Sequence, residues 1–297
     1  MKYTLSVSIA CLLSCFACQA PQAPKNIDEK ENKDSSNTVE TTVDTANADL
    51  VVVNNDTLRL DPNLSPEHRK KVLDIINKEY LTGRFNPAQD GRFDRVAGTH
   101  LVNPNSDPIY MRGEAYAQFI KMQDAAKKEG VRLKIMSATR PFNLQKAIWE
   151  RKWLGRQKVN GKIVPQDAPA KAKAEQILEW NSMPSTSRHH WGTDIDINNV
   201  DPVYWAAEPG LKEYEWLTAH GHEYGFCQVY SKMGADRPYG YQEEKWHWSY
   251  IPIARELVKE YKKQIKNKDI DGFLGAETAE DISVVEKYVL GINPACQ

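Results

Sequence analysis

The sequence predicts an α+β fold on three observations. Apolar residues recur at helical spacing in several segments, for example at Tyr116, Phe119, Ile120 and Ala126. Residues 131–135 instead alternate apolar and basic side chains, the pattern of a half-buried strand. Helices and long loops separate the strand-like stretches without regular βαβ spacing, and this favours α+β over a doubly wound parallel sheet.

Residues 1–18 have the pattern of an export signal. A basic start is followed by an apolar stretch at 5–13 and by small residues. Residues 12–15 resemble a bacterial lipobox, which would make Cys15 the lipidated residue, and Cys18 is a second candidate because Ala17 precedes it. An ordinary cleaved signal peptide is the alternative. We therefore expect a lipoprotein-type signal peptide over 1–18.

Residues 19–50 contain almost no large apolar side chains, so they cannot bury enough surface to offset chain entropy. We expect a disordered linker there and one catalytic domain over 51–297. The net charge of -1 shows none of the excess positive charge that is typical of nucleic-acid-binding proteins. Cys227 and Cys296 could pair in an oxidising compartment, although sequence alone does not give their separation in space.

The first helix of the domain is expected to start at Ser65, which can cap it, with Pro66 in its first turn and Gly83 after its end. Further helices are predicted at about 112–129, from 143 onward, and at 170–180, 211–224, 253–265 and 283–290. Strands are predicted at 131–135, 193–197, 226–230 and 246–250.

A candidate metal site comes from two clusters. His189 and Asp196 flank the start of the 193–197 strand, and His247 follows Glu244 further along the chain. Three protein ligands with one open position are typical of catalytic rather than structural zinc. Zinc lowers the pKa of its water to ~7, and Glu244 could then accept the proton; Glu243 is the competing base.

The 193–197 strand alternates apolar residues with Asp194 and Asp196, so both carboxylates project from one face. A metal would satisfy Asp196, and Asp194 could accept a hydrogen bond from a ligand imidazole. The side chain of His190 should diverge from that of His189. The alternative is a solvated strand face with a surface histidine.

Arg140 follows the 131–135 strand and could stabilise an oxyanion or clamp a substrate carboxylate; a surface salt bridge is the alternative. Gln145, on the first turn of the next helix, could point into the same site. His220 and His222 have no HExxH pattern and are expected at a helix end, facing solvent.

These residues resemble the zinc D-alanyl-D-alanine carboxypeptidase family in its VanY-like branch, which shares its zinc fold with D-Ala-D-Ala dipeptidases and hedgehog-type proteins. The family motifs SxxR with a following Q, SxHxxGxxxD and ExWH stand here at 137–140 with Gln145, at 187–196 and at 244–247. The resemblance covers about 110–250. It implies a small, largely antiparallel sheet that carries zinc, with helices packed around it.

By motif match, the resemblance implies that His189, Asp196 and His247 bind zinc. Glu244 would be the general base and acid, and Arg140 would stabilise the oxyanion or the substrate carbonyl. Gln145 and Ser187 would contact substrate. Two features depart from the family: Asp194 stands where a small or apolar residue is usual, and an insert at 155–186 would reshape the substrate entrance.

The expected function is hydrolysis of the terminal D-Ala-D-Ala bond of peptidoglycan stem peptides. The enzyme would be exported to the bacterial cell envelope, held to a membrane by its N-terminal lipid anchor, and would face the periplasm. Alternatives are D,D-dipeptidase, L,D-carboxypeptidase or endopeptidase specificity at the same site, or a cell-wall binding module without catalysis. No nucleic-acid partner is expected.

Overall fold

The structure is a computed structural model that describes residues 51–52, 58–59 and 76–297. The predictions for the signal peptide, Cys15, Cys18, the 19–50 linker and the helix start at Ser65 lie outside the described residues. Strand β1 (Val51–Val52) pairs with β2 (Leu58–Arg59) in an antiparallel arrangement. The short helix α2 (Lys78–Leu81) is capped by the side chain of Asn77 and precedes Gly83.

The predicted α+β fold is confirmed, with a four-stranded antiparallel sheet at its centre. Its strand order is β5-β6-β8-β7, for β5 (Ile135–Ser137), β6 (Asp194–Ile197), β8 (His247–Tyr250) and β7 (Phe226–Gln228). The central pair places Asp196 directly opposite His247. A separate two-stranded sheet joins β3 (Phe93–Arg95) to β4 (Tyr110–Arg112).

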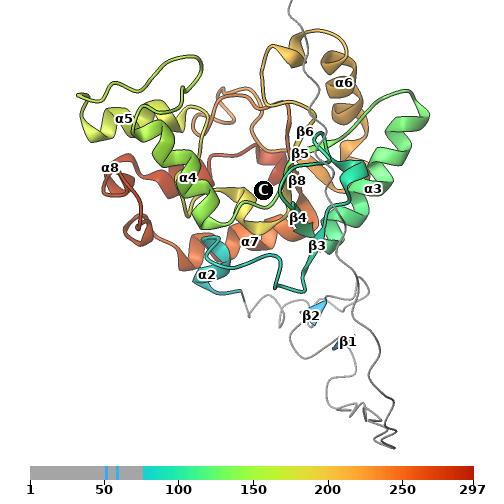
Figure 1. The fold of residues 1–297 in the computed structure, drawn as a ribbon, viewed down its shortest axis with the longest axis horizontal. Helices are drawn as coiled ribbons and strands as arrows, with labels where there is room; N and C mark the ends of the chain where they lie inside the picture. The colour runs from blue at the N-terminus through green and yellow to red at the C-terminus, as the bar shows by residue number, and fades with distance from the viewer. Residues whose placement is uncertain (1–50, 53–57, 60–75) are drawn as a thin grey trace, which may run out of the picture. The chain divides into compact units, whose positions relative to one another are not determined.

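Helices cover the sheet from two sides (Figure 1). On one side lie α3 (Gly113–Lys128) and α6 (Gly210–His220). On the other lie α4 (Phe142–Trp153), α5 (Ala170–Leu178), α7 (Ile251–Gln264) and α8 (Thr278–Ile282). The predicted helices at 112–129, 170–180 and 253–265 therefore agree with the structure within a few residues. No helix among the residues that the structure describes is long and apolar enough to cross a membrane.

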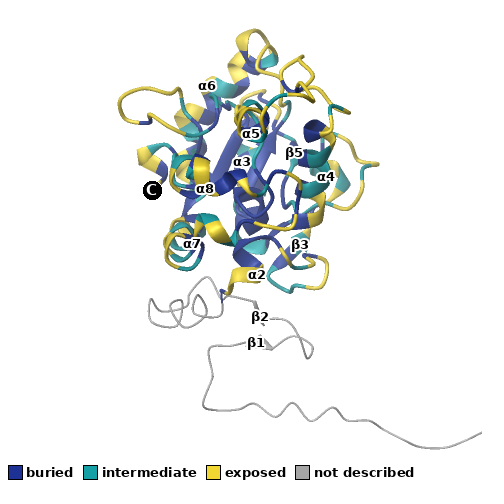
Figure 2. Ribbon diagram, turned by 90° about the vertical axis from the view of Figure 1, so that its left-hand side faces the viewer, coloured by how far each residue is buried: buried dark blue, intermediate teal, exposed yellow. Residues whose placement is uncertain are grey.

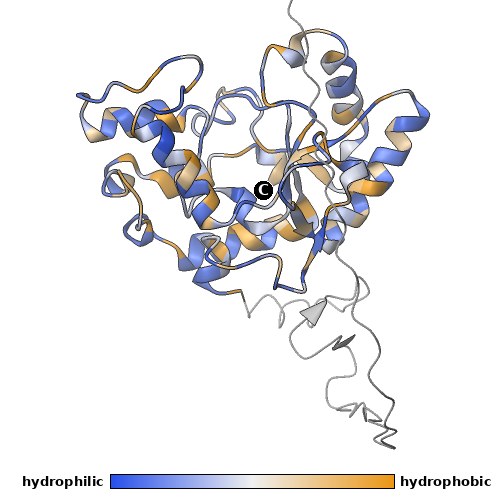
Figure 3. Cartoon of the chain, viewed as in Figure 1, coloured by the Kyte–Doolittle hydropathy of each residue, from blue (hydrophilic) through white to orange (hydrophobic). Residues whose placement is uncertain are grey.

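The core consists of two buried apolar clusters that meet at the sheet. In one cluster, Phe119 of α3 and Leu217 of α6 pack with Ile195 and Ile197 of β6. The other cluster joins α4, α5, α7 and α8. Figure 2 shows these buried residues inside the ring of exposed helix faces, and Figure 3 shows apolar and polar residues alternating along α3. Because Ile195 and Ile197 face the core, the two aspartates of β6 project from its opposite face.

One predicted strand boundary was wrong. Residues 131–134 are not a strand, and β5 starts only at Ile135. The side chain of Asn198 takes the place of a strand neighbour there, because its Oδ1 accepts from the Lys134 amide at 2.7 Å and its Nδ2 donates to the Arg132 carbonyl at 2.7 Å. The predicted helix at 283–290 is present, but over Val285–Val289 it is a π-helix rather than an α-helix.

Cys227 and Cys296 form a disulfide, with Cα atoms 5.7 Å apart. It ties β7, an edge strand of the sheet, to the C-terminal segment across a sequence separation of 69 residues. Closing a loop of this length in the unfolded chain corresponds to about 4 kcal/mol of stabilisation.

We expect the Cys227→Ser/Cys296→Ser protein to lose about 4 kcal/mol of unfolding free energy and about 10 °C of melting temperature. Urea titration and calorimetry measure both quantities. A reductant should lower the melting temperature of the wild type and leave that of the double variant unchanged. Equal melting temperatures for both oxidised proteins would contradict the prediction.

Candidate metal and catalytic site

The three proposed ligands meet because of how the chain enters and leaves β6. His189 lies on a 3₁₀ turn, η3 (Arg188–Trp191), directly before that strand. Gly192 has φ +75° and turns the chain onto β6; a Cβ there would lie 2.2 Å from the Phe93 ring, so only glycine fits. Asp196 then lies opposite His247 on neighbouring strands. Residues distant in sequence thus share one face of the sheet.

His189, Asp196 and His247 are buried and offer ligand atoms that all lie within 4.8 Å of one another. His189 Nε2 is 3.3 Å from Asp196 Oδ1, and His247 Nδ1 is 3.8 Å from the same oxygen. His189 donates Nδ1–H to the Ala138 carbonyl at 2.8 Å, which leaves Nε2 buried without a hydrogen-bond partner. Two imidazoles and a carboxylate around an orphaned buried nitrogen fit a zinc-type site.

Glu244 lies beside this cluster, with its side chain 8% exposed and its Oε2 3.0 Å from His247 Nδ1. Burial raises the pKa of its carboxyl, because the charged form loses hydration. Both features suit a group that accepts and returns a proton. Glu243, the alternative base, is only half-buried.

Burial and neighbouring charges shift the pKa values of all three candidate ligands. Burial, followed by the charge of Arg140, lowers the pKa of His189. Burial opposes ionisation of Asp196, but His189 and Arg140 hold the pKa of that carboxyl below its usual range. Burial also works against a charged His247, yet hydrogen bonds to Asp194 and Glu244 raise its pKa to about 9 in the metal-free protein. A metal must therefore displace a proton from His247.

Arg140 reaches the cluster, with its Nη2 3.6 Å from Asp196 Oδ2 and its Nε buried without a partner. Its backbone is fixed on both sides: its amide donates to the His189 carbonyl at 3.0 Å, and its carbonyl accepts from His190 Nδ1 at 2.5 Å. His190 Nε2 accepts from the Ser185 amide at 3.1 Å, so this imidazole does diverge from that of His189.

The two proposed substrate contacts are buried with unused polar atoms. Gln145 is fully buried and donates from Nε2 to the Ser182 carbonyl at 2.7 Å, while its Oε1 has no partner. The Ser187 hydroxyl is also buried without a partner. Such groups are costly unless something else satisfies them, and a bound substrate is one solution.

Asp194 holds an imidazole, as the strand alternation predicted: its Oδ2 lies 2.9 Å from His247 Nε2. Sequence reasoning missed its other partners, Arg188, Thr193 and Ser249. Arg188 could have been suspected, because a carboxylate on a core strand needs a nearby cation and Arg188 precedes His189 directly. His220 and His222 lie at a helix end, as expected: His222 is exposed, and His220 is partly exposed and pairs with Glu223 at 3.0 Å.

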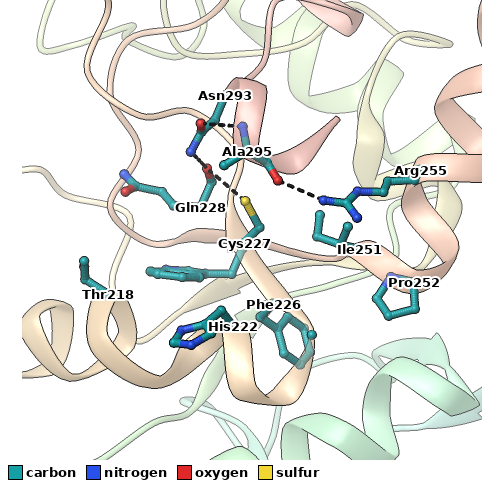
Figure 4. A pocket seen from close by; sticks show the side chains of 12 residues that line it. Thr218, His222, Phe226, Cys227, Gln228, Ile251, Pro252, Arg255, Asn293 and Ala295 are labelled. Carbon is teal, nitrogen blue, oxygen red and sulfur yellow. Dashed lines mark hydrogen bonds between the residues drawn. The ribbon is translucent and has the colours of Figure 1, made fainter.

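A separate cavity of about 440 Å³ lies along β7, and none of its lining residues belongs to the metal cluster. Figure 4 shows its polar groups bonded to one another: Arg255 donates to the Ala295 carbonyl at 3.0 Å, and Asn293 donates to the Gln228 carbonyl at 3.0 Å. It therefore lacks the unsatisfied buried groups that mark the metal cluster.

Lys152 is a buried cation on α4, on the helix that carries Gln145. It is 6% exposed, and its Nζ makes no ion pair or hydrogen bond within 76–297. Burial lowers the pKa of Lys152 to about 8, and the charges of Arg151 and Arg140 act in the same direction. An unpaired buried charge of this kind destabilises the fold.

We expect Lys152→Met to raise the unfolding free energy at pH 7 by about 2 kcal/mol, after allowing for partial solvation of the ammonium. The folded pKa lies below the unfolded value of 10.5, so wild-type stability recovers as pH rises from 8 to 10.5. The advantage of the variant should therefore shrink between pH 7 and pH 9.5. Urea titrations at both pH values measure it, and a pH-independent difference would contradict the assignment.

The fold and the cluster together define a mononuclear metal-site protein with a glutamate beside its ligands. Residues 108–253 match the family model described as VanY: D-alanyl-D-alanine carboxypeptidase. Through this stretch the chain belongs to the VanY family.

Two relatives extend the comparison. The chain is 31% identical over 149 residues to a D-alanyl-D-alanine carboxypeptidase of Enterococcus faecalis, a match that covers 50% of each chain. It is 25% identical over 208 residues to YodJ of Bacillus subtilis, covering 66% of each. The chain thus spans from half to about two thirds of the length of these curated relatives.

Among solved structures, the chain is similar to a variant of the vancomycin resistance D,D-pentapeptidase VanY in complex with Zn(II). The identity is 26% and the TM-score 0.40, over 54% of this chain and 82% of that one. It is also similar to the LD-carboxypeptidase LdcB, at 22% identity and a TM-score of 0.38, over 60% of this chain and 70% of that one.

Proposed function

We propose that this protein is a zinc-dependent D-alanyl-D-alanine carboxypeptidase that removes the terminal D-alanine from peptidoglycan stem peptides. The observation that carries the proposal is the buried cluster of His189, Asp196 and His247 with Glu244 against it, inside the stretch that matches the VanY family.

His189 would hold zinc through Nε2, Asp196 through its carboxylate and His247 through Nδ1, because these atoms face one another. Bound zinc would act as a Lewis acid, which makes water nucleophilic at neutral pH and polarises a carbonyl. The buried setting of the cluster excludes bulk water and strengthens electrostatic interactions with a substrate.

The residues of the chain handle the proton and the developing charge. The water oxygen attacks the carbonyl carbon of the D-Ala-D-Ala bond, and Glu244 accepts a proton from that water. Arg140, with its Nε unpartnered, donates to the carbonyl oxygen as that oxygen becomes negative. Glu244 then gives the proton to the amide nitrogen, the C–N bond breaks, and free D-alanine leaves. Gln145 and Ser187 hold the peptide through their unused polar atoms.

The test is mass spectrometry of a defined pentapeptide muropeptide incubated with the full chain, with and without a chelator. We expect loss of one alanine that the chelator abolishes and added zinc restores. Loss of a dipeptide, cleavage of a tetrapeptide at its L,D bond, or an internal cut would reassign the specificity within the peptidase class. Absence of any cut by the zinc-loaded protein across these substrates would overturn the proposal and favour a binding module.

We propose further that the protein is exported and lipid-anchored in the cell envelope, with Cys15 or Cys18 as the modified residue. The basic start, apolar stretch and lipobox-like segment of residues 1–18 support this proposal. Metabolic labelling with an alkyne fatty acid should modify the wild type and fail in one of the Cys15→Ala and Cys18→Ala proteins. Equal labelling in both single variants and in the double variant would overturn it.

A further inference from the structure

A network of buried polar side chains lies beneath His247. At its centre is Asp194, whose side chain has no solvent exposure. Asp194 Oδ2 accepts from Arg188 Nε and from His247 Nε2, both at 2.9 Å. Its Oδ1 accepts from Thr193 Oγ1 at 2.8 Å and from Ser249 Oγ at 2.6 Å. These four donors satisfy both oxygens of the carboxylate.

Arg188 neutralises this buried charge. Its side chain is also without solvent exposure, its Nη2 donates to Ser249 Oγ at 2.9 Å, and its guanidinium stacks 4.7 Å from the centroid of the Trp191 ring. A buried carboxylate without a cation would be strongly destabilising, and so would a buried guanidinium without an anion. Arg188 and Asp194 therefore belong together as a pair.

The pair decides which nitrogen of His247 faces the ligand cluster. With Nε2–H donated to Asp194, the lone pair of the neutral imidazole lies on Nδ1, which points to Glu244 and Asp196. The ring of Tyr230 packs edge-on against that of His247, with centroids 4.9 Å apart and planes at 87°, and limits rotation of the imidazole.

The pair also separates the two aspartates of β6. Both project from the same strand face, and each could supply a carboxylate to a metal. Asp194 is engaged by Arg188 on the Nε2 side of His247, whereas Asp196 lies on the Nδ1 side with His189. The ion pair thus removes one of two competing carboxylates from the cluster.

From these contacts we infer that Arg188 and Asp194 are positioning residues, which fix His247 as the Nε2–H tautomer with Nδ1 toward the metal. The inference rests on the metal site of the proposed function but not on its substrate. Hydrogen-bonding partners behind a ligating histidine commonly change metal affinity on the order of 10–100-fold when they are removed.

The first experiment measures zinc affinity by chelator competition in the Arg188→Met/Asp194→Ala protein, which loses both buried charges together. We expect zinc binding to weaken on the order of 10–100-fold and the absorption spectrum of the cobalt-substituted protein to change. The matched control is Arg112→Met/Glu114→Ala, which also removes the ion pair of a buried arginine. Arg112 lies 2.8 Å from Glu114 and donates to the Tyr80 hydroxyl, so this pair does not contact His247. Wild-type affinity and spectrum in the Arg188→Met/Asp194→Ala protein would overturn the inference.

The second experiment uses the wild type and so does not depend on folding of a variant. Nitrogen-15 NMR of the zinc-loaded protein should show a proton on His247 Nε2 and a metal-shifted Nδ1. A metal-shifted Nε2 would overturn the inference. Neither readout involves peptide cleavage, so a protein that binds zinc in this way and cleaves no muropeptide would refute the proposed activity while leaving the positioning role intact.

Discussion

Glu244→Gln should lower kcat for muropeptide cleavage by about 10²–10⁴-fold while zinc content stays at the wild-type level. The amide keeps the shape of the side chain and can still contact His247, but it cannot accept a proton from water. Because Glu244 lies beside the three ligand atoms rather than among them, the metal should remain bound. Steady-state kinetics and elemental analysis on the same preparation measure the two quantities.

Glu243→Gln is the matched control, since it makes the same chemical change one residue away on a half-buried side chain. It should retain wild-type kcat and zinc. Full activity with full zinc in the Glu244→Gln protein would refute the assigned base. Loss of activity in Glu243→Gln alone would move the role to that residue.

Arg140→Lys should lower kcat by about 10²–10³-fold, the usual cost of losing one oxyanion donor. Lysine keeps the charge but loses the planar fork, so it cannot bond to Asp196 and to the substrate at once. If Arg140 instead clamps the substrate carboxylate, the loss should appear in KM and vanish with a C-terminally amidated peptide. Kinetics on both peptides separate these roles.

The control for charge is Arg132→Lys, because Arg132 is an exposed residue near the start of the same segment. It should leave both kinetic constants unchanged. An Arg140→Lys protein with wild-type kcat and KM on both peptides would show that the guanidinium contacts neither the oxyanion nor the carboxylate.

Much of the site could be predicted from sequence, because its chemistry is carried by residue types at short spacings. Two carboxylates on alternate positions of a core strand require polar partners, so the sequence alone assigns Asp194 and Asp196 to a polar strand face. Two features could not be predicted from the sequence: the pairing of β6 with β8, and which nitrogen of His247 faces the metal. They depend on which strands become neighbours, and no local pattern encodes that.

The same distinction explains the errors in the fold. The alternation at 131–135 correctly marks Val131, Leu133 and Ile135 as buried. It could not show that the side chain of Asn198, far along the chain, replaces a strand partner for this backbone. The burial of Lys152 is likewise a result of tertiary packing, because a charged residue type by itself gives no sign of burial.

The pairing of Asp196 with His247 on adjacent strands fixes the distance between these two ligand residues. Neighbouring strands keep a spacing of about 4.7–4.9 Å whatever the length of the chain between them. The exposed stretches 160–163 and 232–236 can therefore gain or lose residues without moving a ligand, whereas α5, α6 and β7 in the same connections belong to the core or to the sheet. Such surface stretches can change in evolution or by design while the metal-binding geometry stays constant.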